Sequence, residues 1–178
     1  MRTVDAAPRV ASGAGPSHVT VTRLPSLGHR GEGWVALQVA FLAAAAVAGL
    51  VGPKWPSRAS PWGAAAGGLA VGGGVALLVG GGVGLGRQLT PFPKPVADGR
   101  LRQQGVYRLV RHPMYGGALL CMLGWALVSS PLALAPLGLT AAFLDAKRRR
   151  EEAWLLEQHP GYAEYRRRVR RRFVPFVW

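Results

Sequence analysis

Long uncharged apolar runs alternate with polar segments along this chain. The first run, residues 34–52, contains Gln38 as its one polar residue and is long enough to cross a bilayer core of about 30 Å as a helix. The second run, residues 62–86, is built mostly of Gly, Ala, Val and Leu. Lipid offers no partner for backbone N–H and C=O groups, so this run is also expected to be helical. The pattern therefore predicts two transmembrane helices within residues 33–86.

The second run carries three pairs of glycines at four-residue spacing. These are Gly63 and Gly67, Gly68 and Gly72, and Gly80 and Gly84. Small residues at this spacing let two membrane helices approach closely. We therefore expect this run to pack tightly against a neighbouring helix.

A third run, residues 115–144, has no charged residue and carries Ser129, Ser130 and Pro131 at its centre. Pro131 and Pro136 favour a hairpin of two short helices over one tilted helix. Each half would be shorter than the roughly 20 residues that a full crossing needs, so the depth of the hairpin in the membrane stays open. Residues 87–114, which hold three prolines between positions 91 and 95, are expected to be irregular.

The two ends of the chain are polar. Residues 1–32 have no apolar period and predict a flexible basic leader. From Asp145 the chain becomes strongly charged, with a helix expected over residues 151–158 and a break at residues 159–161. An amphipathic segment is expected over residues 162–172. The predicted fold is all-α and polytopic, with two N-terminal transmembrane helices, a C-terminal helical hairpin and cytoplasmic amphipathic tail helices. Residues 87–178 would form its functional core.

Charge predicts the orientation of this fold. The formal net charge is +14, and all but two of the 22 Lys and Arg residues (Lys54 and Arg58) fall on one side of the expected membrane. The positive-inside rule makes that side, with both termini, cytoplasmic. Topology and attraction to anionic membrane lipids account for the basic residues, and no nucleic-acid-binding motif accompanies them. We therefore expect an integral, multi-pass protein that does not bind nucleic acid.

Two polar clusters flank the expected hairpin. Arg111 and His112 stand at its mouth in the sequence GVYRLVRHPMYGG, a position that interfacial anchoring would also explain. Glu151 and Glu152 follow it, four residues after Lys147 and Arg148. The cation precedes the anion in both pairs, the less favourable order on a helix, which suggests another partner for the carboxylates. S-adenosylmethionine, with its sulfonium, ammonium and ribose diol, suits such carboxylates, and the loop around Arg111 could meet its carboxylate.

The chain resembles the isoprenylcysteine carboxyl methyltransferases and the related membrane phospholipid methyltransferases. The resemblance rests on four features in this order: GVYRLVRHPMYGG, an apolar hairpin, RREEAWLLEQHPGYAEYRRRV and FVPF. The resemblance covers residues 89–176. It implies S-adenosylmethionine as cofactor and an arginine, Arg148, near the methyl acceptor, with Arg111 and Glu151 in the same site. The implied cofactor contacts are Tyr107, His112, Pro113, Tyr115 and Glu152. The chain departs from the family at residues 101–104, where relatives have a Val-Thr-Ser-like stretch, and at Pro160, which could shift the tail helix.

The reaction implied is in-line displacement at the sulfonium methyl group. A carboxylate acceptor would need only orientation by Arg148, whereas a thiol or amine would first lose a proton to His112 or a glutamate. Arg148, His112 and Arg111 are thus the candidate catalytic residues. An isoprenylcysteine-like carboxylate, a phospholipid amine, a small thiol and a quinone-like molecule all remain open as acceptors. A non-enzymatic transporter subunit would favour charges within the spans, which are absent, and a membrane scaffold would depend on the arginines of residues 166–172.

Overall fold

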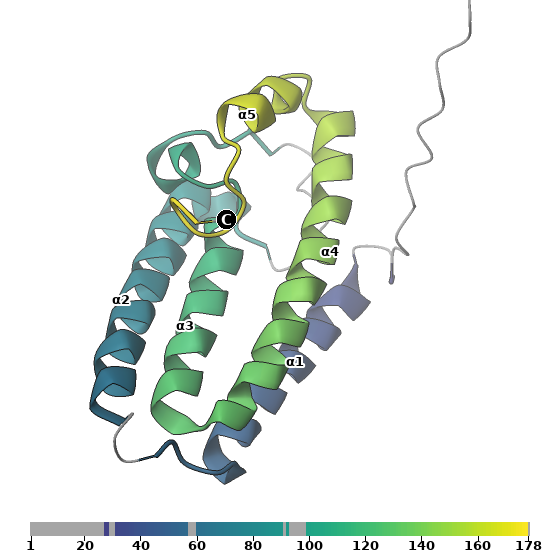
Figure 1. Cartoon of the computed structure of the whole chain (residues 1–178). Coiled ribbons are helices and arrows are strands. Elements are labelled where there is room, and N and C mark those ends of the chain that lie inside the picture. Colours follow the sequence, from purple (N-terminus) through teal and green to yellow (C-terminus); the bar gives the residue numbers. More distant parts are fainter. Residues whose placement is uncertain (1–26, 29–30, 57–59, 91, 93–98, 178) are drawn as a thin grey trace, which may run out of the picture.

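The computed structural model describes residues 27–28, 31–56, 60–90, 92 and 99–177, which form helices and loops and no strand. Four long helices pack side by side, and a short fifth helix lies across one end of the bundle (Figure 1). The elements are α1 (Glu32–Val51), α2 (Ser60–Leu85), η1 (Gly86–Gln88), η2 (Gly105–Arg108), α3 (Pro113–Ser129), η3 (Pro131–Ala133), α4 (Leu134–Gln158) and α5 (Tyr162–Arg168). The prediction of an all-α fold is confirmed for the described residues. The predicted leader lies almost entirely outside them.

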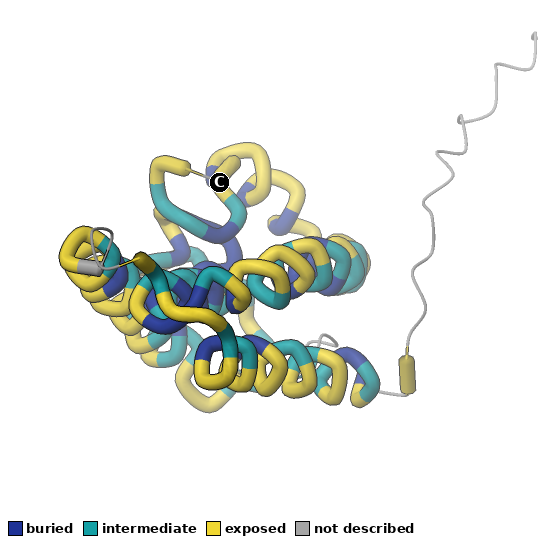
Figure 2. Tube along the Cα trace, turned by 60° about the horizontal axis from the view of Figure 1, so that its bottom comes forward, coloured by how far each residue is buried: buried dark blue, intermediate teal, exposed yellow. Residues whose placement is uncertain are grey.

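Helices α1 and α2 match the two predicted apolar runs and are long and apolar enough to cross a membrane. Most of their surface faces outward (Figure 2). Large apolar side chains such as Leu69 and Val83 are about four-fifths exposed. Such an apolar exterior suits lipid, where outward-facing Val and Leu carry no hydration cost.

The third apolar run forms the predicted hairpin. Helix α3 ends at Ser129, and the Ser130 hydroxyl accepts a hydrogen bond from the backbone N–H of Leu132 (3.1 Å) to cap the turn of η3. Pro131 occupies the first position of that turn, where its missing N–H costs nothing.

The second arm of the hairpin differs from the prediction. Helix α4 does not end near residue 144 and restart at 151, but runs for 25 residues to Gln158. Asp145 forms ion pairs with Arg148 and Arg149 at 2.7 Å each, three and four residues further along the same helix. These pairs neutralise part of the cationic run, so the helix continues through it until the predicted break at His159.

Glycines bring α2 and α3 into close contact. A Cβ atom on Gly74 would lie 2.7 Å from the carbonyl oxygen of Gly117, and a Cβ on Gly117 would lie 2.7 Å from that of Gly74. Gly67 meets the α3 backbone in a similar way, as its spacing predicts. Gly68 and Gly72 face open space, so this pair takes no part in the helix contact that was expected of it.

The segment after α5 folds back over the start of α3. The predicted amphipathic piece, residues 162–172, is helical only as far as Arg168, and residues 169–173 form a non-helical segment that we call the strap. The backbone N–H groups of Arg111 and His112 donate to strap carbonyls at 3.1 and 2.8 Å. Phe173 is fully buried, and its carbonyl lies so close to Gly116 that a Cβ there would overlap it. The strap thereby fixes the segment that leads into α3.

Candidate functional site

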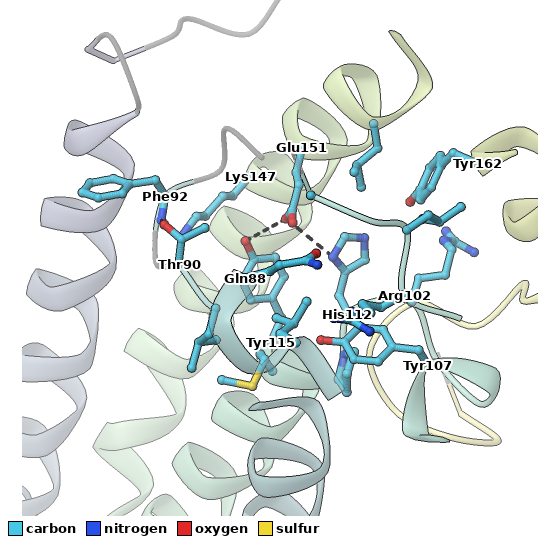
Figure 3. A pocket seen from close by; sticks show the side chains of 18 of the residues that line it. Gln88, Thr90, Phe92, Arg102, Tyr107, His112, Tyr115, Lys147, Glu151 and Tyr162 are labelled. Atoms are coloured by element: carbon cyan, nitrogen blue, oxygen red, sulfur yellow. Dashed lines mark hydrogen bonds and ion pairs between the residues drawn. The ribbon is translucent and has the colours of Figure 1, made fainter. Parts of the chain in front are cut away.

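A cavity of about 570 Å³ lies at the end of the bundle where α3 begins and α5 crosses (Figure 3). Its volume falls in the range of about 300–1,000 Å³ that small-molecule sites occupy. One half of its wall is polar and aromatic, and comes from η2, the loop before it, the start of α3, the end of α4 and α5. The other half is apolar and includes Leu42 of α1, Leu78 of α2, and Met114 and Ala118 of α3.

Glu151 places a carboxylate on the polar half of the wall. Its Oε2 atom accepts a hydrogen bond from the Tyr115 hydroxyl (3.0 Å) and lies 3.6 Å from Nδ1 of His112. The rings of His112 and Tyr115 stack with centroids 5.4 Å apart. This packing holds the carboxylate at the cavity surface, where it can attract a cation.

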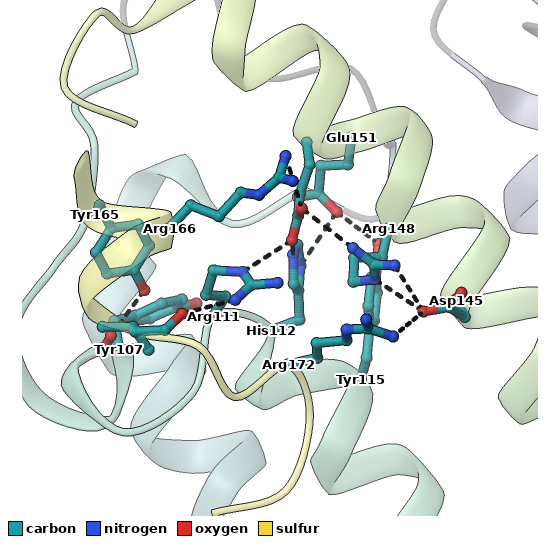
Figure 4. Close-up of polar contacts among 12 residues, drawn as sticks. Tyr107, Arg111, His112, Tyr115, Asp145, Arg148, Glu151, Tyr165, Arg166 and Arg172 are labelled. Atoms are coloured by element: carbon teal, nitrogen blue, oxygen red, sulfur yellow. Dashed lines mark hydrogen bonds and ion pairs between the residues drawn. The ribbon is translucent and has the colours of Figure 1, made fainter. Parts of the chain in front are cut away.

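Glu152 is buried and belongs to a cluster with Arg111, His112 and Arg148, and Figure 4 shows these three partners together. Its Oε1 atom accepts a hydrogen bond from Nε of Arg111 (2.9 Å) and lies 3.0 Å from Nε2 of His112. Its Oε2 atom lies 3.1 Å from Nη1 of Arg148. Burial by itself would raise the pKa of the Glu152 carboxyl. The hydrogen bond from His112 and the charges of His112, Arg111 and Arg148 outweigh it and hold this pKa well below its usual range.

Arg148 is enclosed between two carboxylates. Besides Glu152, it bonds Oδ1 of Asp145 through Nη2 (2.7 Å) and Nε (3.0 Å). Arg172 of the strap approaches the same Asp145 oxygen at 3.5 Å. Burial opposes ionisation of Asp145, but the hydrogen bonds from Arg148 and Arg149 lower its pKa overall. The cluster is therefore charged and paired, and it joins α4 to the strap.

Arg111 joins this cluster to the cavity wall. Its Nη1 atom donates to the carbonyl oxygens of Val169 (2.6 Å) and Arg170 (2.9 Å). The guanidinium thus satisfies strap carbonyls and Glu152 together, and its residue also lines the cavity. Any movement of the strap will be transmitted through these bonds to residues 111–113, which we call the RHP segment.

Three tyrosines add aromatic wall around the cavity. The Tyr165 hydroxyl donates to the carbonyl oxygen of Tyr107 (2.7 Å), and the Tyr107 hydroxyl donates to that of Gly81 (3.3 Å). Gly84 leaves room for the Tyr107 ring, because a Cβ there would lie 2.9 Å from it. Burial raises the pKa of all three phenols, so they are neutral donors at physiological pH.

Tyr162 differs from the other two tyrosines. Its ring lines the cavity, and its hydroxyl is buried without a hydrogen-bond partner among the described residues. A buried hydroxyl without a partner costs about 1–3 kcal/mol. A ligand would have to reach this buried oxygen from the cavity to remove the cost.

The structure brings the eight residues predicted for the site into one region. Six of them line the cavity: Tyr107, Arg111, His112, Pro113, Tyr115 and Glu151. Arg148 and Glu152 are not among the lining residues and lie in the buried cluster beside it. The roles given to all eight remain predictions. Among the described residues, no group of three or more His, Cys, Asp and Glu could hold a metal ion.

Sequence reasoning gave no site role to several lining residues, notably Gln38, Lys147 and Tyr165. Two of these carried a readable signal, because Gln38 is the one polar residue of the first apolar run and Lys147 precedes Glu151 by one helical turn. Tyr165 belongs to the quoted motif, but only the fold brings it beside Tyr107.

Comparison with known proteins gave one family. The model of a family described as phospholipid methyltransferase matches residues 62–160, which include most of α2 and the whole of α3 and α4. No curated protein and no solved structure matched the chain. The matched residues contain the RHP segment and both carboxylates of α4.

Proposed function

The chain belongs to the phospholipid methyltransferase family, and we propose that it transfers a methyl group from S-adenosylmethionine to a lipophilic acceptor at the cytoplasmic face of a membrane. Family membership supports methyl transfer and membrane association. The cofactor, the acceptor and the orientation are our proposal; the first two rest on the cavity and the orientation rests on the distribution of charge.

The observation that carries the proposal is that Glu151, with its carboxylate, and Tyr162, whose buried hydroxyl has no hydrogen-bond partner among the described residues, both line the cavity. S-adenosylmethionine has an ammonium and a sulfonium to meet a carboxylate, and ribose and adenine atoms to meet a phenol hydroxyl. The rings of Tyr107 and Tyr165 provide flat apolar surfaces for a purine. The residues present therefore fit this cofactor.

When bound, S-adenosylmethionine supplies an electrophilic methyl group, and the electron pair of the breaking C–S bond stays on sulfur. Glu151 would hold the cationic part of the cofactor, while Tyr115 and His112 keep that carboxylate in place. The apolar half of the wall would exclude water from the transfer. Such a site works mainly by positioning two reactants in line.

The apolar half of the cavity supports a lipophilic acceptor. The family description favours a phospholipid amine, and an isoprenylcysteine-like carboxylate is the alternative within the same fold. An ammonium must lose a proton before it attacks, and Glu151 is the one carboxylate on the described wall. Both ring nitrogens of His112 face carboxylates, which makes His112 a weaker candidate for this base.

Charge supports the cytoplasmic orientation. The α4 cations and the arginines of α5 and the strap lie at the cavity end of the bundle (Figure 1). The opposite end carries Lys54 in the connection between α1 and α2. The positive-inside rule then turns the cavity toward the cytoplasm.

Calorimetry with S-adenosylhomocysteine on the detergent-purified protein tests the proposal. Tyr162→Phe removes only the unpartnered hydroxyl, so we expect about 2- to 10-fold weaker binding with unchanged or higher thermal stability. Tyr165→Phe is the matched control, because its hydroxyl already bonds the Tyr107 carbonyl. Tyr165→Phe should therefore lower the thermal stability. Any loss of S-adenosylhomocysteine affinity in this variant should come indirectly, from misplacement of Tyr107.

A second readout follows the methyl group. Membranes that contain the protein, supplied with methyl-labelled S-adenosylmethionine, should incorporate label into the organic-solvent-extractable fraction. Absence of S-adenosylhomocysteine binding to folded protein would overturn the proposal and favour a non-enzymatic membrane role. Binding without label in the lipid fraction would keep the cofactor and overturn the lipophilic acceptor.

A further inference from the structure

Four consecutive cations of α4, residues 147–150, point in different directions. Arg148 is enclosed by Asp145 and Glu152, and the Arg149 side chain is 66% exposed and pairs with Asp145. The Arg150 guanidinium lies over the Trp154 ring at 4.5 Å from its centroid. Of these four cations, Lys147 alone lines the cavity.

Lys147 is firmly held at that wall. Its Nζ donates to Oε1 of Gln38 (2.6 Å), which joins α4 to α1, and lies 5.4 Å from the centroid of the Tyr115 ring. The residue is only 1% exposed. Burial lowers the pKa of Lys147, and the charge of Glu151 opposes this effect.

Packing alone gives a weak reason for a lysine here. A buried ammonium carries a desolvation cost that Leu or Met would avoid, and α1 and α4 already meet through apolar side chains such as Phe41 and Phe143. Gln38 is likewise the one polar residue in the apolar stretch of α1. A polar pair retained at a cavity wall points to a ligand.

The position of Lys147 in the cavity indicates which ligand. Lys147 lies one helical turn, about 6 Å along the axis, from Glu151. Figure 3 shows both side chains projecting from α4. Gln38 and Leu42 are one turn apart on α1 and both line the cavity, so the polar pair stands next to the lipophilic wall.

We infer that Lys147, oriented by Gln38, binds an anionic oxygen group of the methyl acceptor, beside the atom that is methylated. This inference rests on the proposed function and names the headgroup chemistry of its acceptor. A phosphodiester next to an amine and a carboxylate at the end of a thioether both supply such a group. Arg148, enclosed in the ion-pair cluster, then stabilises the fold and does not contact the acceptor.

Binding of single-chain lipids to the S-adenosylhomocysteine-saturated protein in a neutral maltoside detergent tests this inference. The probes are oleoyl lysophosphatidylethanolamine, S-farnesylcysteine and, as a neutral control, monooleoylglycerol. The variants are Lys147→Met and Arg149→Met, which remove one positive charge each from the same helix. If Lys147→Met fails to fold, Lys147→Gln gives the same comparison.

We expect at least one of the two probes with an anionic group to bind wild type and Arg149→Met equally and Lys147→Met about tenfold or more weakly, as for a lost charge-assisted hydrogen bond. Lys147→Arg should restore part of the affinity. The probe that responds distinguishes phosphodiester from carboxylate.

Three results would overturn the inference. The first is that both probes with an anionic group bind Lys147→Met as tightly as wild type. The second is that wild type prefers neither of these two probes over monooleoylglycerol. The third is a loss of S-adenosylhomocysteine affinity in Lys147→Met that matches its loss of lipid affinity, since Lys147 would then serve the cofactor. Failure of wild type to bind S-adenosylhomocysteine would instead remove the proposed function itself.

Discussion

Glu151 and Glu152 are adjacent in α4, and we expect neutralising each carboxylate to affect a different property of the protein. Glu152→Gln keeps the shape of the side chain but leaves Arg111 and Arg148 facing a neutral amide in a buried cluster. Breaking a buried ion pair costs about 3–5 kcal/mol. The amide oxygen can still accept one hydrogen bond, so we take the lower limit of about 3 kcal/mol.

That loss can be measured as a melting temperature. For a chain of about 150–250 residues, 1 kcal/mol corresponds to about 2–4 °C, so Glu152→Gln should lower the Tm by about 6–12 °C. Glu151→Gln should leave the Tm within about 2 °C, because its amide oxygen can still accept the Tyr115 hydrogen bond. It should weaken S-adenosylhomocysteine binding by about 10- to 100-fold, the effect of losing one charge-assisted hydrogen bond.

Thermal unfolding and calorimetry on both variants check this reasoning, with Glu157→Gln on the exposed face of α4 as control. A Glu152→Gln protein that melts like wild type but no longer binds the ligand would refute the assignment, because Glu152 would then contact the ligand directly. A Glu151→Gln protein that binds S-adenosylhomocysteine with wild-type affinity would also refute the assignment, because Glu151 would then not contact the ligand.

Three further outcomes follow from the same contacts. The pKa of Glu152 is lower in the folded protein than its ordinary value of 4.5, so its stabilising contribution is complete above about pH 4.5 and is lost as the pH falls below it. Melting curves of wild type should show this acid loss, and those of Glu152→Gln should show less of it. Gly116→Ala should displace the Phe173 carbonyl and cost about 3 kcal/mol or more, measured by Tm together with ligand affinity. Gly74→Ala should destabilise the helix pair by about 1–3 kcal/mol, while Gly72→Ala, which faces open space, should be neutral or stabilising in the same assay.

The sequence was most informative where one physical signal dominated. Uncharged length predicted α1 and α2, and Pro131 with the serines before it predicted the turn between α3 and α4. It was less informative where signals competed. The run of cations after Asp145 looked like the end of a membrane segment, but pairing along the helix lets α4 continue.

The sequence predicted which region forms the site, but not the directions in which its side chains point. Neighbouring residues on a helix point about 100° apart, so the sequence alone could not decide whether Glu151 or Glu152 faces the cavity. Packing against Arg111 and Arg148 decides it. The strap was not foreseen, because its arginine-rich sequence suits an amphipathic helix, and the backbone bonds that keep it extended come from a loop nearly 60 residues earlier.

The strap has a consequence for how the protein becomes active. Arg111 and its carbonyl partner at Val169 are separated by 58 positions, so this contact closes a long loop, whereas the α3–α4 hairpin closes a short one. The helices can therefore insert and pack while the ligand site is still unformed. Local opening of a segment such as the strap needs no more free energy than global unfolding. Hydrogen exchange at the Arg111 and His112 amides would then report how often an inserted, fully helical molecule is temporarily unable to bind its ligand.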